Sequence, residues 1–129
     1  MDDNINHPPH YTKYPAGLDA ECIEYTRHMP FSQGNAFKYL YRAGSKGDPT
    51  EDLAKCAWYV RDAIEHANYI RADLLRGFPC INSNSTNRSK TLRLIAAGRM
   101  RDVELALTYF GVRILETRES AAYEPEGQP

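Results

Sequence analysis

The sequence lacks the features that mark membrane, secreted and disulfide-bonded proteins. No apolar run approaches the roughly 20 residues that a membrane-spanning helix needs. The first residues, MDDNINHPPHY, are acidic and polar, unlike a secretion signal. The three cysteines, Cys22, Cys56 and Cys80, are odd in number and show no CxxC spacing. We therefore expect a cytoplasmic protein that contacts no membrane, in which the cysteines that fall in helical patterns are small core residues.

The sequence also lacks an excess of one charge and a familiar catalytic motif. Its 129 residues, enough for one domain with a modest core, include 16 basic and 17 acidic side chains. This balance predicts no specific nucleic-acid binding, although local charged patches remain open. The segment GSKGDPTED lacks the spacing of a Walker loop, and neither HExxH nor a nucleophile elbow occurs. An active site in this chain must be built from a less familiar pattern.

Hydrophobic periodicity predicts an all-α fold of about five helices. We expect these helices at residues 18–29, 32–43, 49–76, 91–97 and 102–118. The second and third would form a long helical hairpin, preceded by an extended N-terminal arm. A Ser/Asn-rich linker then divides a core, residues 1–76, from a C-terminal appendage and tail, residues 77–129. The composition of the last residues, from 121, predicts a disordered tail.

Turn and capping residues predict where the helices begin and end. Gly44 should end the second helix, because glycine tolerates the positive φ found just past a last turn. Ser32 is the expected N-cap of the second helix and Asp102 that of the last. Asp48 is the expected N-cap of the third helix, with Glu51 completing a capping box.

Polar residues of the second and third helices are predicted to share one rim of the hairpin. On a wheel of 3.6 residues per turn, these residues lie apart from the apolar side of each helix. A short turn between antiparallel helices brings the two polar stripes together. The rim residues are Asn35, Lys38, Arg42, Lys46, Asp52, Lys55 and Tyr59, with Tyr39 on the same stripe of the second helix. Several cations beside a few acids suit a phosphorylated ligand, but a solvated face with i,i+4 charge pairs would show the same spacing.

The N-terminal segment NHPPHY carries two histidines and a tyrosine within six residues. Its prolines keep the segment extended, so it could lie across the hairpin and present His7, His10 and Tyr11 to the rim. An arm that only packs on apolar surface is the competing interpretation. Zinc binding is the weakest of the three, because the HxxH spacing lacks partner ligands.

These segments resemble a known family. The blocks NHPPHY, ECIEYTRHM, GNAFKYLYRAGSKG and EDLAKCAWYV, in this order, are similar to a small protein family of tailed bacteriophages, formerly a domain of unknown function and now described as phage nucleotide kinases. The resemblance spans residues 4–66, with Cys56 where the family has alanine. It rests on Asn6, His7, Pro8, His10, Tyr11, Gly34, Asn35, Lys38, Tyr39, Arg42, Gly44, Lys46, Asp52, Leu53, Lys55, Trp58 and Tyr59. Because lysine and arginine are poor core residues, their place in the pattern favours a phosphate site over a solvated face.

The resemblance implies a (deoxy)nucleoside monophosphate kinase that takes phosphate from ATP in a bacterial host's cytoplasm. Phosphoryl transfer needs positioning and charge neutralisation more than covalent chemistry. The residues implied as catalytic are Lys38, Arg42 and His10. Those implied in substrate binding are His7, Tyr11, Asn35, Tyr39, Lys46, Asp52, Lys55, Trp58 and Tyr59. Asp52 could hold magnesium through water, and no direct protein ligand to a metal is expected.

Two other functions stay open on the sequence. An all-α nucleotide pyrophosphohydrolase would use acidic side chains on paired helices, and Glu21 and Glu24 have its ExxE spacing but lack a facing acid pair. A non-catalytic module that binds a nucleotide or a host protein is the other alternative.

The third predicted helix carries apolar residues on more than one face. Val60 and Ile64 face the expected core, whereas Trp58 and Tyr69 lie opposite them. A helix of a monomer normally shows one apolar stripe. We therefore expect a homo-oligomer with this helix at the interface, unless the C-terminal helices cover its second face.

Overall fold

The computed structural model describes residues 18, 20–45, 47–81 and 86–116, and these residues form an all-α fold, as predicted. Its elements are α2 (Cys22–Thr26), α3 (Phe31–Arg42), α4 (Pro49–His66), the 3-10 turn η1 (Ala72–Leu74), α5 (Asn87–Ala96), α6 (Met100–Phe110) and the 3-10 turn η2 (Gly111–Leu115). Leu18 and Ile81 form an isolated antiparallel bridge, and the described residues contain no longer strand. The expected N-terminal arm and C-terminal tail lie outside the described residues.

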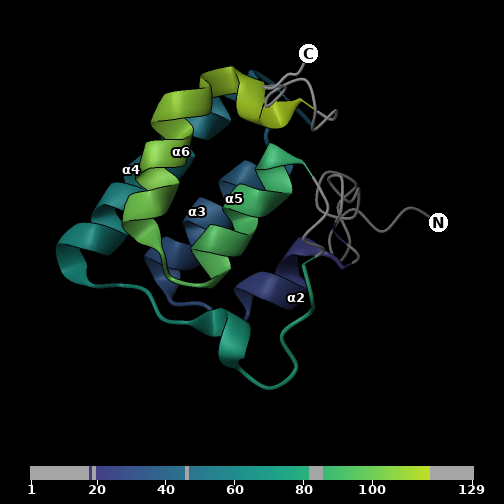
Figure 1. The fold of residues 1–129 in the computed structure, drawn as a ribbon, viewed down its shortest axis with the longest axis vertical. Coiled ribbons are helices and arrows are strands. Elements are labelled where there is room, and N and C mark those ends of the chain that lie inside the picture. Colours follow the sequence, from purple (N-terminus) through teal and green to yellow (C-terminus); the bar gives the residue numbers. More distant parts are fainter. Residues whose placement is uncertain (1–17, 19, 46, 82–85, 117–129) are drawn as a thin grey trace, which may run out of the picture.

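The helices form two layers. The α3–α4 hairpin is one layer, and α5 and α6 lie side by side over it, with α5 on α3 and α6 on α4 (Figure 1). Phe37 and Leu40 of α3 are fully buried, as are Leu92 and Ile95 of α5 and other core residues. The predicted apolar side of α3 is confirmed, because Ala36, Phe37, Leu40, Tyr41 and Ala43 are all buried. Helices from both halves of the chain therefore share one core, which fixes the hairpin in place.

The third predicted helix is shorter than expected. It begins as predicted, with Asp48 as N-cap accepting a hydrogen bond from the Thr50 N–H at 2.9 Å. It ends at His66 rather than residue 76, because Ala67 adopts a left-handed conformation with φ 52°. The next residue, Asn68, accepts a hydrogen bond from the Ser32 N–H at 2.6 Å. Tertiary bonds to α3 thus replace helical ones beyond His66.

A buried glutamine fixes the segment after α4. The Gln33 side chain is fully buried in α3, and its Nε2 donates to Ile70 O at 2.8 Å and to Ile95 O at 2.7 Å. Its Oε1 accepts from the Ile70 N–H at 2.9 Å. One amide therefore joins α3, the segment after α4 and α5, and leaves none of its buried groups without a partner.

Several predicted helix boundaries are wrong. The first helix starts at Cys22, since Leu18 pairs with Ile81 instead, and it ends at Thr26 rather than 29. Ser32 is buried, and its hydroxyl bonds to Asp62 instead of capping α3, whose N-cap is Pro30.

The C-terminal helices also differ from the prediction. The fourth begins at Asn87 rather than 91, because Thr86 caps it by accepting from the Ser89 N–H. Asp102 does not cap the last helix: it pairs with Arg99, the residue at the N-cap, at 2.5 Å. That helix ends at Phe110 and continues as η2 to 115, where Gly111 adopts φ 54°.

Arg88 ties α5 to the end of α3. Its Nη1 donates to three backbone carbonyls, Leu40 O at 3.2 Å, Tyr41 O at 3.1 Å and Ala43 O at 2.9 Å. Burial of the guanidinium lowers the pKa of Arg88. The Leu40 and Tyr41 carbonyls lie in the last turn of α3 and the Ala43 carbonyl lies at its C-cap, where a cation is favoured. Arg88 therefore holds the end of the helix that carries Arg42. Among the described residues, no helix combines the length and apolar character that crossing a bilayer requires.

Candidate functional site

Three cations of the predicted rim gather around one tyrosine ring. The Tyr39 ring centroid lies 4.5 Å from Lys38 Nζ, 5.4 Å from Lys55 Nζ and 5.9 Å from Arg42 Cζ. Lys38 and Arg42 come from α3 and Lys55 from α4, so the hairpin assembles them. Cations within about 6 Å of an aromatic ring are attracted by its electron-rich face. We call these residues, together with Asp52 and Tyr59, the Tyr39 cluster.

The aromatic part of the cluster continues onto α4. The rings of Tyr39 and Tyr59 are nearly parallel, 8° apart in plane, with centroids 5.9 Å apart. Phe31 and Trp58 each meet Tyr59 edge-on, at 5.8 Å and 5.0 Å. Phe31 and Trp58 are 70% and 63% exposed. The face thus offers flat aromatic surface next to positive charge.

A buried carboxylate, that of Asp52, lies next to Arg42. Asp52 is 4% exposed, and its Oδ2 lies 3.5 Å from Arg42 Nε. At that length the contact is an ion pair rather than a hydrogen bond, and no described residue donates a hydrogen bond to this oxygen. A buried carboxylate needs a nearby cation. Asp52 therefore positions Arg42, whose side chain is 20% exposed.

Lys38 and Lys55 differ in their carboxylate partners. Lys55 lies 3.7 Å from Glu51 one turn earlier, a largely exposed pair of small energetic value. For Lys38, no carboxylate of the described residues is within ion-pair distance. Lys38 is therefore a half-buried cation whose charge a ligand could neutralise.

The buried cysteines near this hairpin are inert thiols. Burial raises the pKa of Cys22 to about 12, against an opposing effect of the Lys38 charge, and burial raises the pKa of Cys56 to about 12. All three cysteines are free, and Cys80 is exposed. The prediction that cysteines in helical patterns are core residues is confirmed for Cys22 and Cys56.

The other predicted site residues do not belong to the Tyr39 cluster or lie outside the described residues. Asn35 donates to the Phe31 carbonyl at 2.9 Å, within its own helix, and so lies on the rim without joining the cluster. Trp58 borders the cluster through Tyr59. Four predicted residues lie outside the described part of the chain: His7, His10, Tyr11 and Lys46. Their place relative to the cluster stays a prediction, as do the roles of all the site residues.

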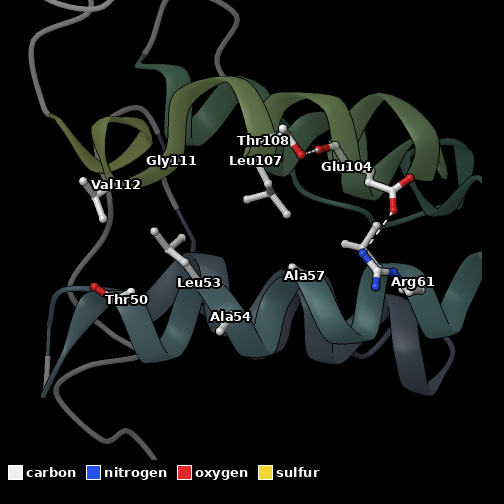
Figure 2. Close-up of a pocket in the computed structure, with 11 residues that line it drawn as sticks. Thr50, Leu53, Ala54, Ala57, Arg61, Glu104, Leu107, Thr108, Gly111 and Val112 are labelled. Carbon is white, nitrogen blue, oxygen red and sulfur yellow. Dashed lines mark hydrogen bonds and ion pairs between the residues drawn. The ribbon is translucent and has the colours of Figure 1, made fainter.

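Hollows formed by described residues occur away from the cluster. One, of about 290 Å³, lies between α4 and α6 and is lined mainly by apolar side chains (Figure 2). Arg61 and Glu104 point toward one another across its end, 3.8 Å apart (Figure 2). Another, of about 380 Å³, adjoins Trp58. Lys38, Tyr39 and Arg42 line neither of these two hollows.

The sequence analysis did not predict the residues that join the helices around the Tyr39 cluster. Gln33 and Arg88 carried no recognisable motif, because their partners are backbone groups distant in sequence. The one available signal was a long polar side chain among apolar positions, as at Gln33, since such a residue must find buried partners. The cations Arg71, Arg93 and Arg99 were also missed, and they line a hollow described below.

The acidic pair considered for a pyrophosphohydrolase serves a local purpose. The Glu24 carboxylate accepts a hydrogen bond from the Glu21 N–H at 3.0 Å, and together the two residues form the capping box of α2. In the described part of the chain, no three His, Cys, Asp or Glu side chains gather where they could hold a metal ion.

The cluster lies within the part of the chain that matches a known family. Comparison with curated proteins gives no match, and comparison with solved structures gives none. The match to a family model covers residues 5–61, which include α2, α3 and the first two thirds of α4. Over these residues the chain matches the protein family of unknown function DUF3310.

Proposed function

We propose that the Tyr39 cluster binds the phosphate and base of a nucleotide, and that the protein is a phage-encoded (deoxy)nucleoside monophosphate kinase. The observation that carries this proposal is the convergence of Lys38, Arg42 and Lys55 on one aromatic ring. Phosphate oxygens suit the cations, and the planar guanidinium of Arg42 suits bidentate contact. The resemblance of these blocks to phage nucleotide kinases supports the choice of reaction.

In the proposed reaction, an oxygen of the monophosphate attacks the γ-phosphorus of ATP. The bond from that phosphorus to its bridging oxygen breaks, and ADP leaves with the electron pair. Lys38 and Arg42 neutralise charge on the transferring phosphoryl group, and Asp52 positions Arg42 from behind. Tyr59 or Trp58 offers a ring on which the base stacks. A role for His10 in contacting the transferred phosphate remains part of the proposal.

Magnesium would enter this reaction with ATP. Asp52 is the buried carboxylate of the cluster, and it already neutralises Arg42. Magnesium in such sites is commonly held by one or two carboxylates, phosphate oxygens and water. We therefore expect most of its ligands to come from the nucleotide and from solvent.

Chromatographic product analysis distinguishes the functional classes. The purified chain is incubated with each deoxynucleoside monophosphate, ATP and magnesium, and separately with nucleoside triphosphates alone. Diphosphate formed from monophosphate supports the kinase. Monophosphate formed from triphosphate indicates a pyrophosphohydrolase, and binding without conversion indicates a non-catalytic module.

We also propose that the protein is a homo-oligomer. Because α4 ends at His66, it is shorter than the helix from which the oligomer was predicted, and this support for an oligomer is smaller. Large apolar residues nevertheless remain exposed on α4 and α6: Trp58 at 63%, Leu105 at 67% and Tyr109 at 68%. Light scattering at tens of micromolar tests this proposal, and a monomeric mass contradicts it.

A further inference from the structure

A second concentration of positive charge surrounds a hollow on another part of the molecule. This hollow has a volume of about 760 Å³ and lies between residues 71–81 and the C-terminal half of α5 with its following turn. Its charged lining residues are Arg71, Asp73, Lys90, Arg93 and Arg99. Four cations thus face one carboxylate in a chain whose net charge is −1. We call this the basic hollow.

Two of the three arginines of the basic hollow pair with carboxylates. Arg71 binds Asp73 through two hydrogen bonds, at 2.9 Å and 3.3 Å. Arg99 pairs at 2.5 Å with Asp102, a residue that does not line the hollow. Arg93 is exposed, and no carboxylate of the described residues pairs with it. Among the described residues, the three arginines thus meet two carboxylates, and positive charge is in excess at Arg93.

The remaining lining is mainly apolar, and two of its residues contact other parts of the fold. It includes Phe78, Pro79, Ile81 and Leu94. The Phe78 ring meets the rings of Tyr25 and His28 edge-on, with centroids 5.5 Å and 5.6 Å away. Ile81 is bridged to Leu18. Phe78 and Ile81 can therefore pack against an apolar part of a ligand.

The buried amide of Gln33 fixes the two cationic walls relative to each other. It binds Ile70, the neighbour of Arg71, and also Ile95, two residues from Arg93. Gly98, next to Arg99, has φ 73°, and a Cβ there would lie 2.9 Å from Ile70 O. Close backbone approach thus brings Arg71 and Arg99 to the same hollow. The fold thus sets the backbone positions of these arginines, whereas the side chains of Arg71 and Arg99 are 59% and 64% exposed.

We propose that the basic hollow binds a small phosphorylated molecule that carries at least two negative charges and an apolar group. Three of its four cations are arginines, whose planar fork matches phosphate oxygens. The volume is within the range of about 300–1,000 Å³ found for small-molecule sites. None of its lining residues belongs to the Tyr39 cluster, so this proposal is independent of the proposed kinase site.

Isothermal titration of the full chain with inorganic tripolyphosphate tests the proposal, with Lys38→Ala present in every protein compared so that the Tyr39 cluster contributes little to binding. The Arg93→Gln/Arg99→Gln variant should bind about tenfold or more weakly than the Lys38→Ala protein, because two charge-assisted contacts are lost. Arg101→Gln removes an exposed charge two residues away that does not line the hollow, and it should bind as the Lys38→Ala protein does. Equal affinities of Arg93→Gln/Arg99→Gln and Arg101→Gln overturn the proposal.

A gain of affinity gives a readout that unfolding cannot imitate. Asp73→Asn removes the carboxylate in the lining and releases Arg71, so tripolyphosphate should bind about two- to fivefold more tightly at low salt. Weaker binding by this variant contradicts the proposal. So does a glutamate hexapeptide that binds the Lys38→Ala protein as tightly as tripolyphosphate does, because the ligand class would then be carboxylate. The apolar group is tested by ATP, which should bind the Lys38→Ala variant more tightly than tripolyphosphate does. Equal affinity there removes the apolar group from the proposal.

Discussion

Replacing Gln33 by leucine should destabilise the fold more than any other change of similar size on α3. The substitution keeps most of the volume but removes an amide that serves both the N–H and the carbonyl of Ile70. Ile70 is 43% exposed and both bonds are only partly buried, so water replaces part of what is lost, and we expect a loss of about 1–3 kcal/mol in the free energy of unfolding. The Ile95 carbonyl adds less, because it also accepts from the Gly98 N–H at 2.9 Å.

Urea unfolding followed by circular dichroism measures this loss. Asn35→Leu is the matched control, since it removes an amide from the same helix that is bonded only within its own turn. We expect that variant to stay within about 0.5 kcal/mol of wild type. The expected loss at Gln33 is large against the roughly 5–15 kcal/mol stability of typical domains. A loss below 1 kcal/mol, or one equal to that of the control, would refute the role given to the buried amide.

Three further predictions concern backbone and thiols. Gly98→Ala should lower the free energy of unfolding by about 1–3 kcal/mol, because Gly98 has a positive φ and the added Cβ would lie 2.9 Å from Ile70 O. Gly77→Ala, also at positive φ but in open space, should lower it less. Thermal unfolding compares the two variants, and equal losses of stability contradict the packing argument. In the native protein at pH 8 a thiol reagent should label Cys80 alone, and labelling of Cys22 or Cys56 at the same rate contradicts their burial. The thiols of Cys22 and Cys56 have a pKa of about 12 in the folded protein, whereas in the unfolded chain they ionise near pH 9. The free energy of unfolding should therefore fall as pH rises from 9 to 12. It should fall less in a Cys22→Ala/Cys56→Ala variant.

The local pattern of the sequence was enough to predict the hairpin and the gathering of its cations. Helical periodicity separates the buried face of α3, with Phe37 and Leu40, from the face with Lys38 and Arg42. The start of α4 was predictable because its N-cap is a local signal. Neither inference depends on contacts distant in sequence.

The features that the sequence did not reveal depend on such distant contacts. Helical propensity continues past His66, but Asn68 and Ile70 form hydrogen bonds with Ser32 and Gln33, 36 and 37 residues before them, and these bonds end the helix. The basic hollow unites Arg71 with Arg93, two cations that no helical or strand repeat relates. Only the packing of α5 against the rest of the fold brings them together.

The rate of phosphoryl transfer in a Lys38→Ala variant tests the central claim most directly. Lys38 has no carboxylate partner among the described residues, so its loss leaves no buried charge unpaired, unlike removal of Arg42 beside Asp52. Diphosphate formation from a deoxynucleoside monophosphate and ATP should fall by about 10²- to 10³-fold, equivalent to about 2–4 kcal/mol of transition-state stabilisation. Arg101→Ala, which removes an exposed charge far from the cluster in sequence, should keep wild-type turnover, and both variants should keep the wild-type circular dichroism spectrum. Near-normal turnover in a folded Lys38→Ala variant would contradict the assignment of the Tyr39 cluster as the phosphate site.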